Sequence, residues 1–261
     1  MKRLSISIVI YEGYEDCLCA VKSIEEATSP ELEKQIYLID NSDQQRASQA
    51  EKELKAYAAE HSDITYIANG KNIGFGAGHN LVLKDLDSAY HAIVNPDIIL
   101  KEDAFSKILD FMDENPDIGM VIPRILTEDG ELQKVYRRDL TIRDMFIRMF
   151  CGNHFQKRQD YHTMQDMDYE KVFDLPFGQG SFLVIRTELL KKIEGFDDRF
   201  FLYMEDADLC KRLRQKARFV YFPGASVIHK WEKGSHKSKK LFRIHVSSMI
   251  KYFCKWGIFG K

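Results

Sequence analysis

The sequence contains few cysteines, and they show no recognisable pairing. Five are scattered over 261 residues, an odd number without the spacing of a disulfide framework or a zinc site. Cys17 and Cys19 are separated by one residue, which does not match a redox-active pair. We therefore interpret the cysteines as small buried hydrophobic residues in a reducing compartment.

Long apolar runs are also absent from the sequence. No stretch approaches the ~20 apolar residues of a membrane span. The apolar run at positions 4–10 is too short for a signal peptide, and a turn-like pair, Glu12-Gly13, follows it. There is no internal repeat and no low-complexity segment. We expect a globular, cytoplasmic protein of one large or two small domains.

The charged residues are distributed unevenly along the chain. Positions 209–261 hold 14 Lys or Arg and a single acid, whereas positions 1–208 hold 24 Lys or Arg and 39 acids. A basic part interleaved with aromatic residues indicates an anionic partner, either a phosphate-rich ligand or an anionic membrane surface. The alternative is a solvated charged face. We expect no nucleic acid partner.

Apolar segments alternate with amphipathic ones through the first half of the chain. The pattern predicts strands at 6–10, 36–39, 64–67, 92–94 and 120–122, and helices at 15–28, 46–61, 80–86 and 101–115. This alternation indicates an α/β fold, in which a parallel sheet carries helices on both faces. The high Ile and Val content of the strands fits burial on both sides of the sheet.

The second half of the chain is less regular. A stretch rich in charge and aromatic residues at 136–173 is interpreted as an insertion over the site rather than as a separate domain. Strands are predicted at 181–186 and 219–222, and helices at 188–193, 206–218 and 239–257.

Asp97 stands just after the apolar strand predicted at 92–94. Ligands of open α/β sheets bind at the carboxyl ends of the strands, so an acid here is a candidate ligand for Mg²⁺ or Mn²⁺. The alternative is an Asn-Pro-Asp turn. Asp40 closes the strand predicted at 36–39 and could accept a hydrogen bond from a nucleotide base or ribose, although the following Asn41 and Ser42 also suit a turn.

A glycine-rich loop at 69–80 is the second candidate binding element. Glycines at positions 74, 76 and 78 let the backbone approach a ligand closely, and the loop opens a helix whose N-terminus favours a phosphate. The loop is not a P-loop, because no Gly-Lys-Ser/Thr follows. The alternative is a glycine-rich turn without a ligand.

Glu205 and Asp206 are adjacent carboxylates at the start of a predicted helix. Neighbouring helical residues point about 100° apart, so we expect one to face the cleft and the other to cap the helix. A carboxylate in a cleft can act as a general base. His229 follows a strand and a turn, and imidazole is a good metal ligand; the alternative is a structural histidine.

Taken in order along the chain, these motifs resemble those of an inverting glycosyltransferase of family two, in particular the bacterial rhamnosyltransferase branch. The matching residues are Asp40-Asn41-Ser42, Asn72-Ile73-Gly74-Phe75, Asn80, Asn95-Pro96-Asp97, Gly180-Ser181, Gly195-Phe196-Asp197, Phe200-Phe201-Leu202-Tyr203, Glu205-Asp206-Ala207-Asp208 and His229. The resemblance implies the GT-A fold, a Rossmann-like nucleotide-binding sheet with helices on both faces, merged with an acceptor-side subdomain. We place one such domain at 1–235, with a nucleotide-sugar half at 1–123 and an acceptor half at 124–235, followed by a C-terminal segment at 236–261.

The resemblance also implies roles for individual residues. It implies that Asp40 contacts the nucleotide base and that Asp206, beside Glu205, is the catalytic base. It implies that Asp97 is the last acid of the metal motif and that His229 helps to hold the metal or the diphosphate. The remaining expected donor contacts are Tyr11, Asn41, Asn72, Gly74, Phe75, Asn80 and Asn95. The chain departs from the family at Asn95, where an acid is usual, and at Tyr11-Glu12, where Tyr-Asn or Thr-Asn is usual.

The reaction implied by the resemblance is transfer of L-rhamnose from dTDP-L-rhamnose, with inversion. The expected acceptor is a saccharide, lipid-linked, in bacterial cell-surface polysaccharide synthesis; another dTDP- or UDP-sugar is the alternative donor. A nucleotidyltransferase or nucleotide-sugar hydrolase would need a basic phosphate loop near the N-terminus, which positions 11–14 do not provide. A nucleotide-sugar-binding protein without activity is disfavoured by the presence of Asp97, Asp206 and His229 together.

The segment at 236–261 interleaves basic and apolar residues. At helical spacing Phe242, Val246, Met249, Phe253 and Trp256 fall on one side, as in an amphipathic helix on an anionic bilayer. This pattern predicts peripheral contact with the inner face of the plasma membrane. The alternatives are that the stripe packs on the catalytic domain or on a second subunit of a homodimer.

Overall fold

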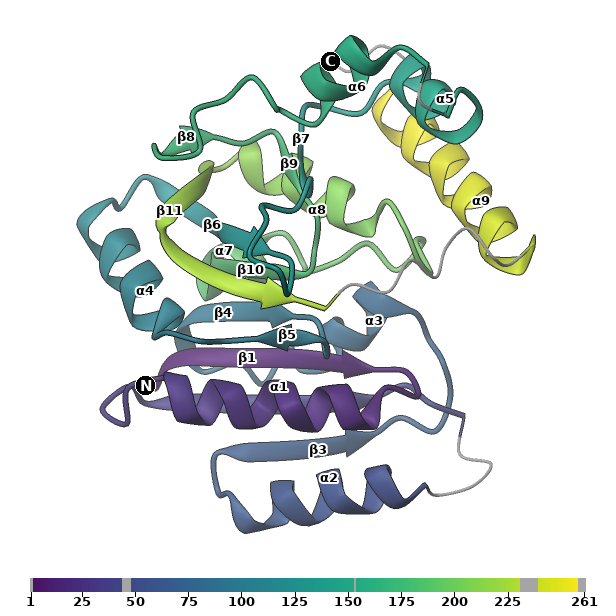
Figure 1. Cartoon of the computed structure of the whole chain (residues 1–261). Coiled ribbons are helices and arrows are strands. Elements are labelled where there is room, and N and C mark those ends of the chain that lie inside the picture. The colour runs from purple at the N-terminus through teal and green to yellow at the C-terminus, as the bar shows by residue number, and fades with distance from the viewer. Residues whose placement is uncertain (1, 44–47, 153, 231–238, 258–261) are drawn as a thin grey trace.

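The computed structural model of the chain describes residues 2–43, 48–152, 154–230 and 239–257. Its central feature is a mixed β-sheet in the order β3-β2-β1-β4-β10-β6-β11-β5, surrounded by helices (Figure 1). Positions 46–47 of the predicted second helix, and positions 236–238 and 258–261 of the C-terminal segment, lie outside the described residues.

The first half of the chain forms the parallel part of this sheet. Strand β1 pairs in parallel with both β2 and β4, and β2 pairs in parallel with β3. The Ile, Leu and Val side chains of β1 are buried on both faces, as the sequence predicted. The elements are β1 (Lys2–Ile10), α1 (Tyr14–Ala27), β2 (Lys34–Asp40), α2 (Gln49–Glu60), β3 (Ile64–Ala68), α3 (Phe75–Asn80) and β4 (Ser88–Val94).

The helix predicted at 80–86 was misplaced. Helix α3 lies earlier, inside the glycine-rich loop, and begins directly after Gly74. Turns follow it, and Val82 and Leu86 are buried from these turns. Their apolar spacing therefore reflects burial of successive turns rather than one face of a helix.

The parallel sheet predicted from the first half of the chain is extended by a strand that runs the other way. Strand β10 (Phe182–Arg186) lies between β4 and β6 (Ile118–Leu126) and runs antiparallel to both. The chain leaves β6 at the carboxyl edge of the sheet and re-enters it in β10 after the insertion. Because β10 starts from that same edge, it must run in the opposite direction.

The insertion between β6 and β10 forms a cover at one end of the molecule (Figure 1). The Tyr136 hydroxyl anchors it, donating to the Pro123 carbonyl at 2.7 Å and accepting from the Ile125 N–H at 2.8 Å. The Tyr136 ring packs on Tyr221, whose ring stacks on Phe173. The elements are β7 (Tyr136–Arg137), α5 (Ile142–Phe150), α6 (Gln156–His162), β8 (Phe173–Asp174) and β9 (Phe177–Gly178).

Strand β11 (Arg218–His229) is much longer than the strand predicted at 219–222. The Pro-Gly pair at 223–224 does not end it, because an irregularity between Phe222 and Ser226 absorbs these residues. The strand continues to pair with β5 (Ile98–Ile99), which places His229 opposite Ile98. The other elements are α4 (Ala104–Glu114), α7 (Thr187–Lys192), α8 (Glu205–Arg214) and α9 (Lys239–Trp256).

None of the described helices is both long and apolar enough to cross a membrane.

Candidate active site

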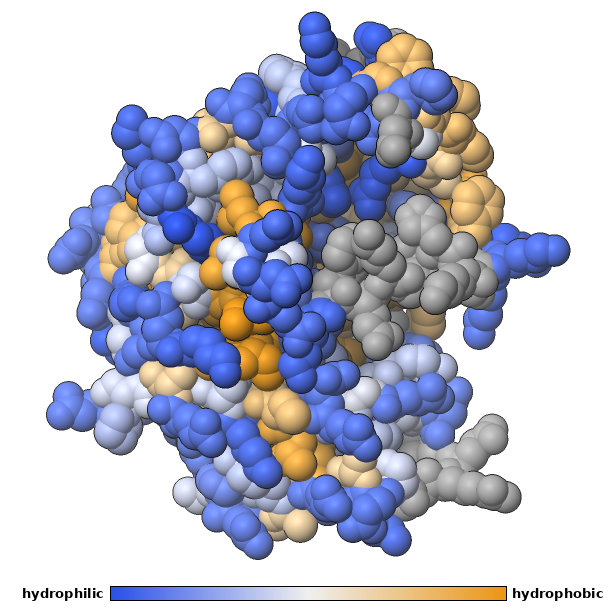
Figure 2. All heavy atoms as spheres, in the orientation of Figure 1, coloured by the Kyte–Doolittle hydropathy of each residue, from blue (hydrophilic) through white to orange (hydrophobic). Residues whose placement is uncertain are grey.

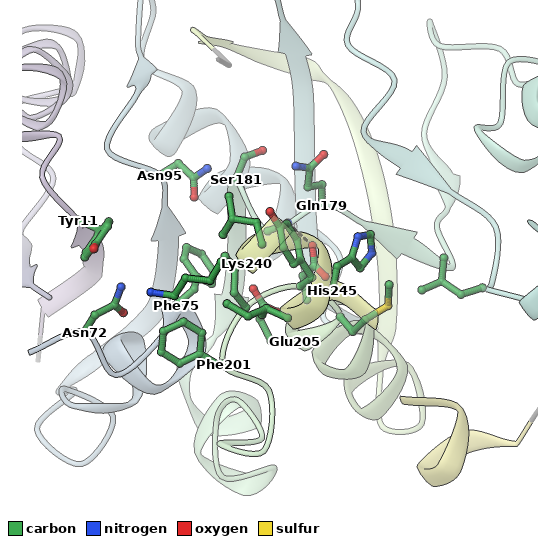
Figure 3. Close-up of a pocket in the computed structure, with 18 of the residues that line it drawn as sticks. Tyr11, Asn72, Phe75, Asn95, Gln179, Ser181, Phe201, Glu205, Lys240 and His245 are labelled. Atoms are coloured by element: carbon green, nitrogen blue, oxygen red, sulfur yellow. Dashed lines mark hydrogen bonds between the residues drawn. The ribbon is translucent and has the colours of Figure 1, made fainter. Parts of the chain in front are cut away.

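A cavity of about 870 Å³ lies at the carboxyl ends of β1 and β4. Tyr11 and Asn95, the residues that follow these strands, contribute to its wall. In Figure 3, Tyr11 and Asn72 lie on one side, and Gln179 and His245 on the other. The lining residues used below are Tyr11, Asn72, Phe75, Asn95, Arg137, Met145, Arg148, Gln179, Ser181, Glu205, Asp206, Lys240, Leu241, Ile244 and His245.

Both carboxylates at the start of α8 line this cavity. The preceding residues, Tyr203 and Met204, have φ angles of 68° and 70°, a left-handed conformation that is rare outside glycine. Met204 is the residue at the N-terminal boundary of α8, and its side chain makes no capping hydrogen bond. The expected separation of one cleft-facing acid from one capping acid is wrong, because both acids line the cavity and Asp206 also accepts from the first-turn N–H of Ala207.

Asp206 lies among groups that favour its charged form. Its Oδ2 accepts from the Gly180 N–H at 3.2 Å, and its Oδ1 accepts from the Ala207 N–H at 2.8 Å. Burial raises the pKa of Asp206, but these N–H groups and the guanidinium groups of Arg137 and Arg148 oppose that shift.

Glu205 has a different environment. Its Oε2 atom is buried without a hydrogen-bond partner among the described residues. Burial, and after it the charge of Asp206, raise the pKa of Glu205 to about 8. The two N–H bonds and the nearby guanidinium groups make Asp206, rather than Glu205, the better placed of the two carboxylates to carry charge and accept a proton.

Asp97 and His229 lie together, although they are far apart in the sequence. The His229 Nε2 and Asp97 Oδ1 atoms are 3.3 Å apart, and both are buried without a hydrogen-bond partner in the part of the chain that the structure describes. The His229 Nδ1 atom lies 3.0 Å from the Gln133 Oε1, and the Gln133 Nε2 donates to the His229 carbonyl at 2.7 Å. Since an amide oxygen only accepts, Nδ1 carries the proton and Nε2 offers a lone pair.

These two side chains fit a divalent metal. An imidazole lone pair and a carboxylate oxygen are suitable ligands, and Gln133 holds the imidazole as an outer partner usually does. Two ligands at right angles on Mg²⁺ are about 3 Å apart, close to the observed separation. No cluster of three or more His, Cys, Asp or Glu suited to a metal occurs in the described ranges, so the rest of the coordination shell would come from substrate or water.

The glycine-rich loop is fixed by backbone contacts. Gly74 has a φ of 97°, and its N–H donates to the Asn72 Oδ1 at 3.0 Å. The buried Asn41 side chain donates to the Gly74 carbonyl at 2.9 Å. The next N–H, of Phe75, donates to the Phe201 carbonyl at 3.1 Å. The loop is thereby tied to the segment that precedes α8.

We expect Gly74→Ala to destabilise the protein more than Gly70→Ala. Both glycines have a left-handed φ, but a Cβ at Gly74 would lie 2.3 Å from the Phe201 carbonyl oxygen, whereas one at Gly70 would meet nothing within 4 Å. The left-handed backbone costs alanine about 1–2 kcal/mol at either site, and the overlap at Gly74 adds roughly 1–3 kcal/mol. Urea unfolding of the two variants measures the difference; equal losses would contradict the close approach.

Besides Asn41, which bonds the Gly74 carbonyl, two further residues predicted to contact the donor are engaged inside the protein. The buried Asp40 carboxylate accepts hydrogen bonds from the Tyr14 and Tyr66 hydroxyls, at 3.1 and 2.6 Å, and from the Ser42 N–H at 2.9 Å. The Asn80 side chain donates to the Phe196 carbonyl and accepts from its N–H. Neither side chain lines the cavity, so their predicted contacts with the donor remain predictions.

Several lining residues did not emerge from the sequence. Arg137 and Arg148 come from the irregular insertion, where no periodicity indicates which side chains face inward. Helix α9 contributes four more, Lys240, Leu241, Ile244 and His245. Gln133, the partner of His229 outside this lining, also has no motif around it.

Helix α9 packs against α8, the helix that carries Glu205 and Asp206. The Trp256 Nε1 donates to the Asp208 Oδ1 at 2.8 Å, and the Lys255 Nζ lies 2.6 Å from the same oxygen. Tyr252 and Phe253 are buried, but Phe242, predicted to share their side, is 47% exposed. The apolar side of α9 therefore packs on the domain near the C-terminal end of the helix and is exposed near the start of the helix.

Comparisons with known proteins agree with this geometry. The family model described as Glycosyl transferase family 2 matches residues 5–194. The chain is similar to the rhamnosyltransferase WbbL of Escherichia coli, with 25% identity over 259 residues that cover 95% of this chain and 92% of that protein. It is also 25% identical, over 189 residues, to the N-acetylglucosaminyl-diphospho-decaprenol L-rhamnosyltransferase of Mycobacterium tuberculosis, an alignment that covers 67% of this chain and 61% of that one.

Among solved structures, the chain resembles the mannosyltransferase PcManGT of Pyrobaculum calidifontis, described in complex with GDP-Man and Mn²⁺. The TM-score is 0.66 with 14% identity, and the match covers 99% of this chain and 65% of that one. At this level of identity the similarity concerns the fold alone.

Proposed function

Because this chain belongs to glycosyl transferase family 2, we propose that it transfers L-rhamnose from dTDP-L-rhamnose to a saccharide acceptor, with inversion at the anomeric carbon. Family membership and the GT-A fold, both predicted from the sequence, are confirmed, and the chain is a glycosyltransferase. The names of the two relatives support the choice of sugar.

The observation that carries the proposal is the composition of the cavity. It joins donor-side residues that follow the parallel strands, Tyr11, Asn72 and Asn95, to the carboxylate of Asp206. A nucleotide sugar bound along the strand ends would present its anomeric carbon toward Asp206. An acceptor hydroxyl on the other side of that carbon would then lie within reach of the carboxylate.

In this arrangement Asp206 is the general base. The acceptor oxygen attacks the anomeric carbon as its proton passes to an Asp206 oxygen, and the nucleotide diphosphate leaves from the opposite face of the sugar. The Gly180 and Ala207 N–H groups orient the carboxylate for this transfer. Glu205, held protonated beside it, adds no second charge to repel the departing diphosphate.

Asp97 and His229 are the residues that would hold a divalent ion, Mg²⁺ or Mn²⁺. When bound, such an ion neutralises negative charge that develops on the leaving diphosphate. Asn95, which lines the first cavity two residues before Asp97, carries an amide where the family usually has an acid. Asp97 is therefore the one carboxylate of the Asn95-Pro96-Asp97 motif.

Slow hydrolysis of nucleotide sugars tests the proposal. The protein is incubated with Mn²⁺ and, separately, with dTDP-L-rhamnose, UDP-glucose, UDP-N-acetylglucosamine and GDP-mannose, and the released nucleotide diphosphate is measured. We expect dTDP-L-rhamnose to be hydrolysed fastest. Preference for a UDP-sugar would identify the alternative donor, and binding without turnover would indicate a binding protein.

A lipid-linked acceptor is supported by the surface beside the cavity. Phe146 and Phe150, one turn apart on α5, are 57% and 60% exposed, and Phe242 and Ile250 are exposed on α9. Both helices also line the cavity, and their apolar side chains appear on one side of the surface in Figure 2. An exposed aromatic surface flanked by Lys239 and Arg243 fits the interface of an anionic bilayer.

The membrane contact predicts co-sedimentation with vesicles that contain phosphatidylglycerol, reduced at high salt. The double change Phe146→Ser and Phe150→Ser is expected to weaken binding by roughly tenfold or more, since each ring loses apolar burial in the interface. Leu81→Ser, an exposed apolar residue outside this surface, is the matched control. Recovery of the unaltered protein in the supernatant under every condition would leave this surface as a contact between two copies in a homodimer.

A further inference from the structure

A second cavity, of about 800 Å³, adjoins the active site. All of its lining residues lie between positions 127 and 230, in the acceptor half of the domain. It shares Arg137, Arg148 and Gln179 with the first cavity. These side chains therefore stand at the passage between the second cavity and Asp206.

The two shared arginines lack the carboxylate partners that neighbouring arginines have. Arg138 pairs with Asp166 at 2.8 Å, and Arg158 pairs with Asp144 at 2.6 Å. Arg137 and Arg148 form no ion pair within the described ranges, and the Nε of Arg137 is buried without a hydrogen-bond partner there. Some arginines of the insertion are thus paired with carboxylates, whereas Arg137 and Arg148, which line the cavity, are not.

The electrostatics of this pair favour a bound anion. The positive charge of Arg148 lowers the pKa of Arg137, after the larger effect of burial, while Asp206 opposes that shift. The cavity is also lined by Glu128, Asp129, Glu131 and Asp144, but Asp144 is paired with Arg158 and none of the four forms an ion pair with Arg137 or Arg148 in the described part of the chain. The two guanidinium groups therefore remain available to an anion. Arginine forks match the oxygen geometry of phosphates.

We propose that Arg137 and Arg148 bind a phosphate or diphosphate ester carried by the acceptor, and so place the acceptor hydroxyl next to Asp206. This inference rests on the proposed function, because it assigns an acceptor to the second cavity. The cavity contains none of Tyr11, Asn72 and Asn95. Its competing occupant is the donor diphosphate, because His229 lies at its rim.

Calorimetry with the donor site filled separates these occupants. The protein is saturated with dTDP and Mg²⁺, and geranyl diphosphate or glucose 1-phosphate is titrated in. We expect geranyl diphosphate to bind while dTDP stays bound, and Arg137→Gln and Arg148→Gln each to weaken it by roughly 10- to 100-fold, the effect of losing a hydrogen bond to a charged group. Arg143→Gln, an exposed arginine of α5 that does not line the cavity, should leave it unchanged.

The outcomes distinguish this inference from the proposed function. If glucose 1-phosphate binds as tightly as geranyl diphosphate, the phosphate site stands and its ligand is a soluble sugar phosphate. Equal binding in the arginine variants, absence of a second anion site, or a matching loss of dTDP affinity would overturn the assignment. Failure of the unaltered protein to bind any dTDP or UDP nucleotide would instead refute the proposed function.

Discussion

Replacing Asp206 by asparagine is expected to lower kcat by about 10²- to 10⁴-fold, the usual contribution of general-base catalysis. Asparagine is nearly isosteric, and its amide oxygen can still accept from the Gly180 N–H. Folding and dTDP affinity should therefore remain close to those of the unaltered protein. Steady-state kinetics with a transferable acceptor, together with nucleotide calorimetry, would show a loss in kcat without a loss in binding.

Glu205→Gln is the matched control for this change. Glutamine resembles the protonated carboxyl group that burial favours at Glu205, so we expect a much smaller loss of turnover. The two residues are adjacent and line the same cavity, and each substitution replaces a carboxyl group by an amide of the same size. If Glu205→Gln proved the more damaging variant, the roles assigned to the two carboxylates would have to be exchanged.

The second large effect is expected at Asp97. Asp97→Ala should remove metal-stimulated turnover, because His229 alone would remain to hold the ion. Metal stabilisation of a leaving diphosphate is worth several kcal/mol, so we expect a loss of at least about 10²-fold. Turnover measured across a Mn²⁺ titration, with thermal unfolding as a check on folding, gives the result.

Asp85→Ala provides the comparison for the loss of an acid. Asp85 is exposed and lies outside both cavities, so its removal should leave the metal dependence intact. Chelation by EDTA should reduce the unaltered protein to the level of Asp97→Ala. Undiminished activity of the unaltered protein in EDTA would remove the metal from the mechanism.

The parallel half of the fold could be predicted because its signals are local. Burial on both faces keeps charged residues out of the middle of β1, β2 and β4, and the helices between them keep a regular apolar spacing. The direction of β10 has no such signal. The direction of β10 depends on the edge of the sheet from which the chain returns after the insertion. That edge is a property of the tertiary structure.

The candidate site could be predicted only in part for the same reason. Asp97 and Asp206 follow or precede regular elements, so their positions could be inferred from the pattern and the family resemblance. Asp40 also ends a strand, but its three internal hydrogen bonds involve Tyr14 and Tyr66, whose approach depends on packing. Arg137 lies in the two-residue strand β7 and Arg148 in helix α5, and neither element was predicted within the stretch at 136–173.

The central position of β10 also bears on how the chain folds during synthesis. Strand β10 begins at Phe182, 88 residues after β4 ends at Val94. At a translation rate of about 5–20 residues per second, the N–H and C=O groups along that side of β4 wait roughly 4–18 s for their partner. During this interval the nascent chain presents an apolar strand edge of the kind that recruits other chains. The two halves of the domain are thus inseparable as folding units, and a fragment ending before β10 would be prone to aggregation.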